Sequence, residues 1–309
     1  MGVWIDTDMG FDDIAAVLVV RHCGDPLDGI SLVFGNTDLA QVERNAASAA
    51  KTFDWPFPLH RGRSLPVLCH LETAQSILGD LGMPTAGKRL PDVPVSLHPQ
   101  DAFAALCRWL ETGPDGHRRI LALGPLTNIA ALCLARPDLA ARIDELVWMG
   151  GGVTSGNHTA SAEFNAFADP EAAAIVIAHG LPLKMVDLDL CRKVLAAPAD
   201  VAPVRAGSGR NAELLADLLA GFIDIAVQRG RQAMSLYDAV AAVAFVHPDL
   251  VVWRQARIDI ELQGQHTRGR TVVETRPLRA PFNASYAADI KADAALKIIL
   301  DVFNNEACR

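Results

Sequence analysis

The sequence lacks the features that mark membrane proteins and nucleic-acid-binding proteins. No apolar run approaches the ~20 residues that a membrane-spanning helix needs. Acidic residues outnumber basic ones by 36 to 28, which gives a net charge of −8 and no general attraction to phosphate backbones or anionic lipid. We therefore expect neither a nucleic-acid partner nor a membrane partner.

The chain also lacks the cysteine patterns of disulfide-rich or zinc-binding proteins. Its six cysteines form no CxxC pair and lie mostly in apolar segments, as in proteins of a reducing compartment. The first residues, VWIDTD, have neither the basic region nor the apolar run of a signal peptide. These observations predict a cytoplasmic protein.

Short aliphatic runs alternate with longer, alanine- and leucine-rich helical patterns over most of the chain. The predicted strands are residues 3–5, 30–34, 119–123, 145–149 and 181–186, and the predicted helices are residues 12–23, 101–112, 128–135, 170–179 and 212–229. This alternation predicts the α/β fold class, with an open, mainly parallel sheet flanked by helices. In such sheets ligands bind beyond the carboxyl ends of the strands.

Residues 54–99 are the least regular part of the sequence and contain seven prolines. The segment still carries apolar residues such as Leu68, Ile77 and Leu81, which flexible linkers lack. We interpret it as a loop-rich excursion or lid within a single domain over residues 1–309. A linker between two domains is the alternative.

Four carboxylates follow the first predicted strand within eight residues, in the segment DTDMGFDD. Asp6 and Asp8 share one face of the strand because side chains alternate between faces with a period of two. Gly10 permits a sharp turn, and Asp12 and Asp13 stand at the start of the next helix. One of the last two could simply cap that helix. Four like charges this close, with no Lys or Arg nearby in sequence, instead predict a bound cation. Oxygen ligands favour Ca²⁺ or Mg²⁺ over zinc.

The spacing of Asp6 and Asp8 also occurs in metal-dependent phosphatases that resemble the haloacid dehalogenases. That family resemblance requires Thr or Val soon after the second aspartate, whereas Met9 and Gly10 stand here. A phosphatase therefore remains an alternative with a weaker sequence match.

Other polar groups follow the remaining strands and provide oxygen or amide groups with almost no positive charge. Asn36 follows the second strand, LGPLTN follows the third, and MGGG leads into GNHTASAEFN after the fourth. Tyr237 and Asp238 open a later helical run. A sugar diol suits such a site better than a phosphate does.

Taken in order, these motifs resemble the inosine–uridine nucleoside hydrolase family over nearly the whole chain. The matching segments are DTDMGFDD, FGN, LGPLTN, MGGG, GNHTASAEFN and the late Asp238. The resemblance implies a single domain of the nucleoside-hydrolase fold, a tightly held Ca²⁺, and a homodimer or homotetramer. It also implies that the chain hydrolyses the N-glycosidic bond of ribonucleosides, giving ribose and a free nucleobase in nucleoside salvage.

The resemblance further assigns roles to individual residues. Metal ligation falls to the carboxylates of Asp8, Asp13 and Asp238 and to the backbone carbonyl of Leu123. The residues that it implies bind the ribose hydroxyls and the 5′ end are Asp12, Asn36, Asn157, Glu163 and Asn165. We expect Asp8 to act also as the general base that deprotonates the attacking water, because a carboxylate that holds the water can also accept its proton.

The chain departs from the family pattern where the leaving base is protonated. Tyr237 stands where many members have His, and QSILGDLG at residues 75–82 replaces a frequent His-Gly segment. Cys191 likewise replaces a more usual Thr. Tyr237 at neutral pH is a poor proton donor but can stack on a base, which predicts a purine preference. The missing His keeps open an impaired nucleoside-binding protein as an alternative.

Several nearby residues have simpler structural interpretations. Thr127 and Asn128 are expected to cap the following helix, and Asp169 to cap the helix that begins at Pro170. Phe164 is expected to be a core residue. His22, His179 and His247, which lie in helices or at helix ends, are expected to be structural.

Overall fold

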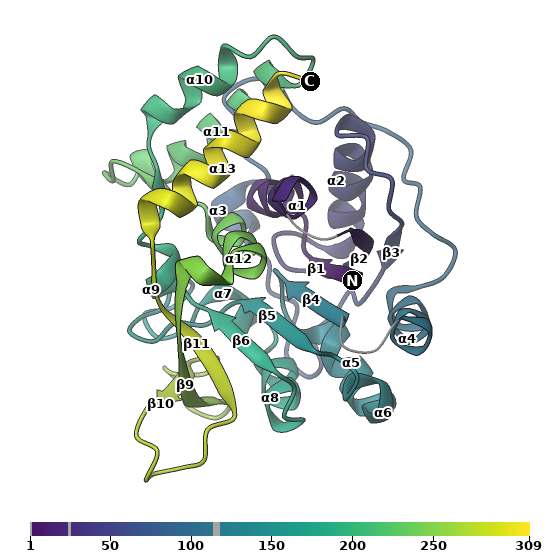
Figure 1. Cartoon of the computed structure of the whole chain (residues 1–309), viewed down its shortest axis with the longest axis vertical. Coiled ribbons are helices and arrows are strands. Elements are labelled where there is room, and N and C mark those ends of the chain that lie inside the picture. The colour runs from purple at the N-terminus through teal and green to yellow at the C-terminus, as the bar shows by residue number, and fades with distance from the viewer. Residues whose placement is uncertain (1, 24–25, 114–117) are drawn as a thin grey trace.

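A nine-stranded sheet forms the centre of the molecule (Figure 1). The computed structural model describes residues 2–23, 26–113 and 118–309. In chain order the sheet strands are β1 (Gly2–Thr7), β2 (Leu27–Leu32), β3 (Leu59–Arg61), β4 (Arg118–Ala122), β5 (Glu145–Met149), β6 (Leu183–Val186), β9 (Val251–Ile260), β10 (Thr271–Glu274) and β11 (Ala284–Ile290). Their spatial order is β10-β9-β11-β6-β5-β4-β1-β2-β3.

Each strand pairs in parallel with its neighbour along the series β11-β6-β5-β4-β1-β2-β3, which confirms the predicted mainly parallel sheet. In the described part of this sheet both antiparallel pairs involve β9, which lies between β10 and β11. Residues 251–290 therefore add an edge that the sequence pattern did not predict. Strand β9 mixes buried, intermediate and exposed positions, whereas every residue of β1 is buried.

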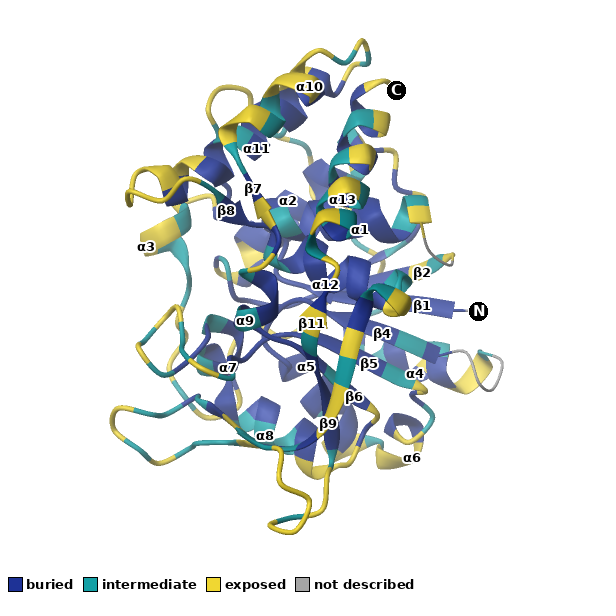
Figure 2. Ribbon diagram, turned by 60° about the vertical axis from the view of Figure 1, so that its left-hand side comes forward, coloured by how far each residue is buried: buried dark blue, intermediate teal, exposed yellow. Residues whose placement is uncertain are grey.

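Helices cover both faces of the sheet, so β1 is buried throughout and β4, β5 and β6 are mostly buried (Figure 2). In β1, Val3 and Ile5 contribute to the core on one face and Trp4 to the core on the other. The first core contains α1 (Phe11–Cys23), α2 (Leu39–Thr52), α11 (Ala212–Val227), α12 (Tyr237–Val246) and α13 (Ala292–Ala307). The second contains α4 (Ala102–Thr112), α5 (Thr127–Ala135), α6 (Pro137–Ala140) and α8 (Pro170–Ala178).

The remaining elements are short and lie mostly near the carboxyl ends of the parallel strands. They are α3 (Gln75–Leu78), α7 (Phe164–Ala168), α9 (Leu188–Cys191), α10 (Val201–Arg205), the 3₁₀ turns Pro198–Asp200 and Pro248–Leu250, and a two-stranded sheet of β7 (Leu195–Ala196) and β8 (Met234–Ser235). No described helix is long and apolar enough to cross a membrane.

Residues 54–99 contain only β3 and α3 and otherwise have no regular secondary structure. Trp55, Phe57 and Met83 are nevertheless buried in the same core as α1 and α11. The segment is therefore packed onto the α/β domain. Its movement as a lid remains a prediction.

Helix α1 follows β1 after a tight turn. Its residues from Ile14 to Val20 are buried on all sides between the sheet and α12 and α13, which fits an apolar pattern without a polar stripe. The left-handed residue of the turn is Met9, with φ of 31°. Gly10 is needed for space, because a Cβ there would lie 2.7 Å from the Asn36 amide nitrogen.

Candidate active site

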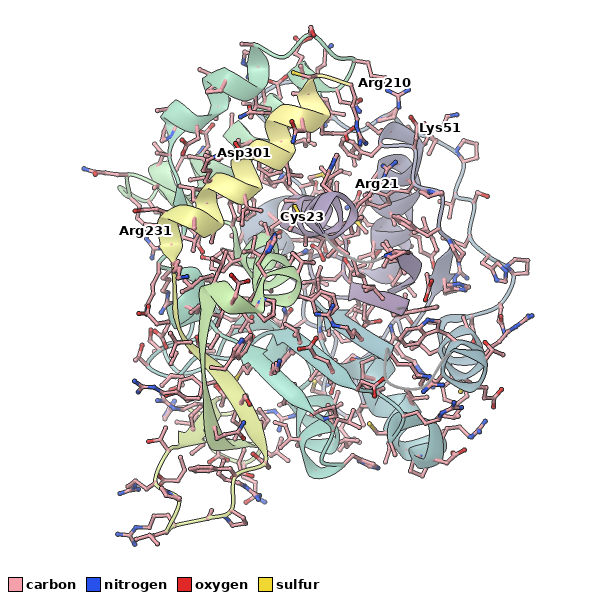
Figure 3. The ribbon with its side chains drawn as sticks, in the orientation of Figure 1. Arg21, Cys23, Lys51, Arg210, Arg231 and Asp301 are labelled. Atoms are coloured by element: carbon pink, nitrogen blue, oxygen red, sulfur yellow. The ribbon has the colours of Figure 1, made fainter. Side chains whose placement is uncertain are left out.

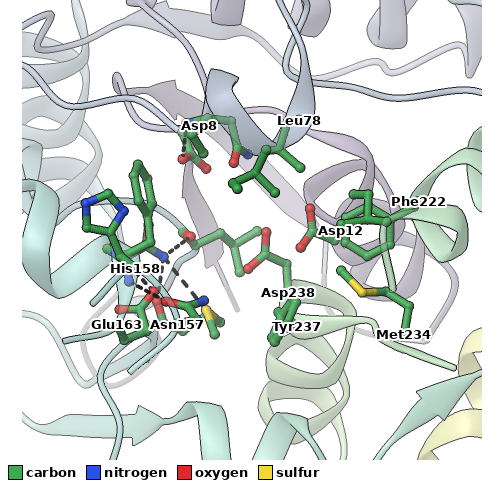
Figure 4. Close-up of a pocket in the computed structure, with 18 of the residues that line it drawn as sticks. Asp8, Asp12, Leu78, Asn157, His158, Glu163, Phe222, Met234, Tyr237 and Asp238 are labelled. Atoms are coloured by element: carbon green, nitrogen blue, oxygen red, sulfur yellow. Dashed lines mark hydrogen bonds between the residues drawn. The ribbon is translucent and has the colours of Figure 1, made fainter. Parts of the chain in front are cut away.

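A cavity of about 320 Å³ opens where β1, β2, β4 and β5 have their carboxyl ends (Figure 4). The structure brings nearly every predicted site residue to its wall: Asp8, Asp12, Asn36, Leu123, Asn157, Glu163, Asn165, Tyr237 and Asp238. Asp13 lies behind this wall and accepts a hydrogen bond from the Asn36 side chain, with 3.1 Å between the atoms. Residues far apart in sequence thus meet at one edge of the sheet.

The carboxylate of Asp8 is held by the loop that follows β2. The backbone N–H of Asn36 donates to Asp8 Oδ2 over 2.7 Å. Gly35 lies so close that a Cβ on it would be 2.0 Å from the same oxygen. Burial, followed by the negative charge of Asp13, raises the pKa of Asp8 well above its ordinary value.

Asp13 is fixed by three donors from the turn before α1 and from the neighbouring loop. The Thr7 hydroxyl donates to Oδ1, and the Gly10 N–H donates to Oδ2 over 2.7 Å. The Asn36 amide completes the set. Burial raises the pKa of Asp13, although these donors favour its ionised form.

Asp238 opens α12 and completes a cluster of buried acidic groups. Carboxylate oxygens of Asp12, Asp13 and Asp238 lie within 4.8 Å of one another. Burial raises the pKa of Asp238, and the charges of its neighbours raise it further. Burial and the charge of Asp13 raise the pKa of Asp12 to about 8. Figure 4 shows Asp8, Asp12 and Asp238 around the same part of the cavity.

This donor set fits a hard divalent cation. Within the described ranges, no Lys or Arg side chain forms an ion pair with Asp8, Asp12, Asp13 or Asp238. Mutually repelling carboxylates in a buried site require a compensating charge. Leu123 adds a backbone carbonyl on the cavity wall, and this oxygen also accepts a hydrogen bond from Asn165 Nδ2 over 2.7 Å. Carboxylate and carbonyl oxygens are typical Ca²⁺ ligands.

Glu163 and Asn165 lie at the start of α7. The Glu163 carboxylate caps this helix by accepting from the N–H groups of Asn165 and Ala166, at 2.7 and 3.0 Å. It also accepts from the Gly151 N–H at 2.8 Å, which ties α7 to the loop after β5. Burial raises the pKa of Glu163 to about 7 in spite of these donors.

Two amide atoms near α7 have no hydrogen-bond partner among the described residues. Asn165 Nδ2 donates to the Met149 carbonyl at 3.0 Å, and Asn157 Oδ1 accepts from the Phe164 N–H at 2.9 Å. These bonds orient both side chains while leaving Asn165 Oδ1 and Asn157 Nδ2 without a partner. An acceptor and a donor on a cavity wall suit sugar hydroxyls.

The wall near α11 and α12 is mainly apolar. Leu78, Phe222 and Met234 line it together with Tyr237. Tyr237 is half-buried, and burial raises the pKa of its hydroxyl. Its backbone carbonyl accepts a weak hydrogen bond from the Cys191 thiol, with 3.6 Å between the atoms. An aromatic ring beside aliphatic side chains provides a surface on which a planar base can stack.

Some of the sequence interpretations were wrong. Asp6 is not in the cavity: its Oδ1 accepts from Ser31 and Asn128, and burial raises its pKa to about 7. Asn128 does not cap α5, because its side chain instead ties β1 to the last residue of β2 and to the loop after β3. Thr127 donates to Asp169, which caps α8 as predicted.

Four basic side chains of the cavity were not predicted from the sequence, and one phenylalanine was misjudged. His158 lines the cavity, and its ring lies 4.4 Å from that of Phe167. Phe164, expected in the core, lines the cavity as well. The expected near absence of positive charge was wrong, because three arginines line the same cavity: Arg192, Arg229 and Arg231. His158 lies inside the segment GNHTASAEFN and could have been recognised from the sequence. The arginines follow no recognisable motif.

Comparison with known proteins agrees with this geometry. The family model described as inosine-uridine preferring nucleoside hydrolase matches residues 3–297. The non-specific ribonucleoside hydrolase RihC of Salmonella paratyphi B is 32% identical over 301 residues, which cover 97% of this chain and 96% of that protein. The protein of the same name from Salmonella typhimurium is also 32% identical over 301 residues.

Solved structures give the same result. The purine-preferring ribonucleoside hydrolase from Gardnerella vaginalis superposes with a TM-score of 0.90 at 25% identity and covers 100% of this chain and 99% of its own. An inosine-guanosine nucleoside hydrolase superposes with a TM-score of 0.87 at 25% identity, with 98% of each chain covered. The chain therefore belongs to the inosine-uridine preferring nucleoside hydrolase family and is an N-glycosyl hydrolase that acts on ribonucleosides.

Proposed function

We propose that this enzyme is Ca²⁺-dependent and prefers purine ribonucleosides. The observation that supports Ca²⁺ most strongly is the group of buried carboxylates that has no basic partner in the described structure. These carboxylates adjoin a cavity whose other walls offer amide groups and an aromatic ring. Asp8, Asp13, Asp238 and the Leu123 carbonyl would hold the ion. Bound there, Ca²⁺ would lower the pKa of a water molecule and orient the vicinal ribose hydroxyls.

Asp8 is the proposed general base. Its carboxylate lies on the cavity wall, and the Asn36 N–H fixes its orientation. In the proposed reaction Asp8 takes a proton from water, the water oxygen bonds to C1′ of the ribose, and the C1′–N bond breaks. The electron pair of that bond passes to the nucleobase, which takes a proton from solvent. Neighbouring carboxylates stabilise the positive charge that develops on the sugar.

The proposed ribose contacts divide between two sides of the cavity. Asp12 and Asn36 lie on the side of the acidic cluster and would bind the 2′ and 3′ hydroxyls. Asn157, Glu163 and Asn165 lie around the start of α7 and would hold the 5′ end. The existing hydrogen bonds of Asn157 and Asn165 orient both side chains before substrate binds, which favours catalysis by pre-positioning.

Tyr237 is proposed to stack on the base rather than to protonate it. Its raised pKa makes the phenol an even poorer proton source at neutral pH than an exposed tyrosine. Phe222 and Met234 supply apolar contacts on the same wall, and a larger purine would bury more of this surface than a pyrimidine. These contacts support the proposed purine preference.

We further propose nucleoside salvage in the cytoplasm and a homodimer or homotetramer. All six cysteines, which lie within the described part of the chain, are free. Free thiols are typical of a reducing compartment. Analytical ultracentrifugation would test the assembly, and a monomer at micromolar concentration would contradict it.

A metal-content and substrate-panel experiment tests the proposal. Protein purified without chelator should contain one Ca²⁺ per chain and release reducing sugar from inosine faster than from uridine. Chelation should abolish the activity, and added Ca²⁺ should restore it. Stoichiometric zinc or full activity without a divalent metal would overturn the calcium proposal. Faster hydrolysis of uridine would overturn the purine preference.

A further inference from the structure

Three arginines give the cavity a positively charged sector that the nucleoside hydrolase reaction does not explain. Arg192 follows α9, and Arg229 and Arg231 lie in the turn between α11 and β8. Gly230, between the last two, has φ of 76°, a left-handed conformation that other residues rarely adopt. Gly230 thus permits a turn in which the arginines on either side of it both line the cavity.

The three guanidinium groups differ in what they already bind. Arg192 donates to Ser155 Oγ at 2.8 Å and to the Gly156 carbonyl at 2.9 Å, and it lies 3.5 Å from Asp189. Arg229 and Arg231 are exposed, and neither side chain has a hydrogen bond or ion pair within residues 2–23, 26–113 and 118–309. Figure 3 shows Arg231 toward the outer edge of the molecule. Their charges are therefore available to a ligand.

The arginines lie on the same wall as the surface proposed for the base. Met234 and Tyr237, which follow the turn, line the cavity together with Arg229 and Arg231. The acidic cluster, where the ribose would bind, contributes Asp12 and Asp238 to the same cavity. A base attached to that ribose would direct its distal edge toward the exposed turn.

We propose that Arg229 and Arg231 bind negative charge on the nucleobase edge that faces away from the ribose. The substrate class is ribonucleosides with an anionic base: a pyrimidine that carries a carboxylate, or an oxopurine that ionises near neutral pH. This inference rests on the proposed function, because it uses the same orientation of ribose and base. Guanidinium groups donate paired hydrogen bonds to such planar acceptors.

Two matched substrate pairs test the proposal at pH 8. Xanthosine is largely anionic there and guanosine is neutral, with nearly the same shape. 5-Carboxyuridine and 5-methyluridine differ in charge at one ring position. In the wild-type enzyme the anionic member of each pair should have the lower KM. Arg229→Gln and Arg231→Gln should each raise that KM by about three- to tenfold, the range for partly exposed charge-assisted contacts.

The variants should leave kcat nearly unchanged, because a rim contact persists in both the ground state and the transition state. The KM values of guanosine and 5-methyluridine should also stay unchanged. Arg108→Gln is the matched control, since Arg108 is an exposed arginine on α4 outside the cavity lining. High salt should shrink the difference within each pair through screening.

The outcomes separate this inference from the proposed function. Hydrolysis of guanosine with no preference for xanthosine and no effect of the arginine variants would overturn the inference alone. Equal losses on neutral and anionic substrates would also overturn it. A loss confined to inosine 5′-monophosphate would assign the arginines to a 5′-phosphate instead. If no nucleoside is hydrolysed, calorimetric titration of the same pairs into the same variants still measures the arginine contribution.

Discussion

Adding a single methyl group at Gly35 should disable the enzyme without removing any functional group. A Cβ at this position would lie 2.0 Å from Asp8 Oδ2 and 2.8 Å from Asp8 Cγ. Both distances are far inside van der Waals contact, so the Asp8 carboxylate or the loop after β2 must move. Either movement would break the 2.7 Å hydrogen bond from the Asn36 N–H to Asp8.

The expected effects on stability and on rate differ in size. Overpacking a buried site costs about 1–3 kcal/mol, which is a fraction of the ~5–15 kcal/mol that stabilises a typical native protein. Gly35→Ala should therefore fold. Its turnover should fall by about 10²–10⁴-fold, the range for loss of a correctly placed general base. The rate loss should greatly exceed the loss of folded protein.

The assay combines urea denaturation, Ca²⁺ content and initial rates of inosine hydrolysis on one preparation. Gly29→Ala is the matched control, because its Cβ would lie 2.6 Å from the Trp4 ring and not near the cavity carboxylates. The control should lose stability but keep kcat. A folded Gly35→Ala enzyme with near-normal kcat would refute the assigned role of Asp8, as would an equal rate loss in Gly29→Ala.

Three further predictions concern other residues of the site. Asp238→Ala should lose Ca²⁺ and activity together, as measured by elemental analysis and initial rates, and an inactive variant with full Ca²⁺ would contradict its role as a ligand. Tyr237→Phe should be tolerated, whereas Tyr237→Ala should lose mainly inosine rather than uridine hydrolysis; equal damage by both would assign the role to the hydroxyl. The pKa of Glu163 rises from 4.5 to about 7 on folding, so its contribution to stability is full below pH 4.5 and is lost as the pH rises through 7. Urea denaturation should show that the free energy of unfolding of the wild-type protein declines by about 3 kcal/mol over this range and that Glu163→Gln removes this decline. A variant with the same pH profile as the wild type would refute the raised pKa.

The sequence alone determined the fold class and most of the candidate site. Short apolar strands alternating with helices allow few arrangements other than a parallel sheet with helices on both faces. In such a sheet the residues after each strand meet at one edge, which is why Asp8, Asn36 and Leu123 were predicted together. The fold class and the meeting of these strand ends follow from local periodicity and general rules of chain connection. The roles expected for Asn157, Glu163 and Asp238 came instead from the resemblance to the nucleoside hydrolase family.

Only the tertiary structure decided which polar groups face the cavity. Asp6 and Asp8 were grouped by their spacing, but Asp6 lies within β1 and accepts hydrogen bonds from Ser31 and Asn128. Asp8 follows the strand and lines the cavity. The antiparallel strands β9 and β10 were not predicted, because their buried and exposed positions do not alternate regularly.

The arginines of the turn after α11 were missed for a different reason. Arg229 and Arg231 lie more than 200 residues after Asp8 in the chain, yet all three line one cavity. The sequence spacing of charged residues carries no information about such distances. Electrostatic interaction depends on separation in space, and only the packing of α11 and β8 against the sheet fixes that separation.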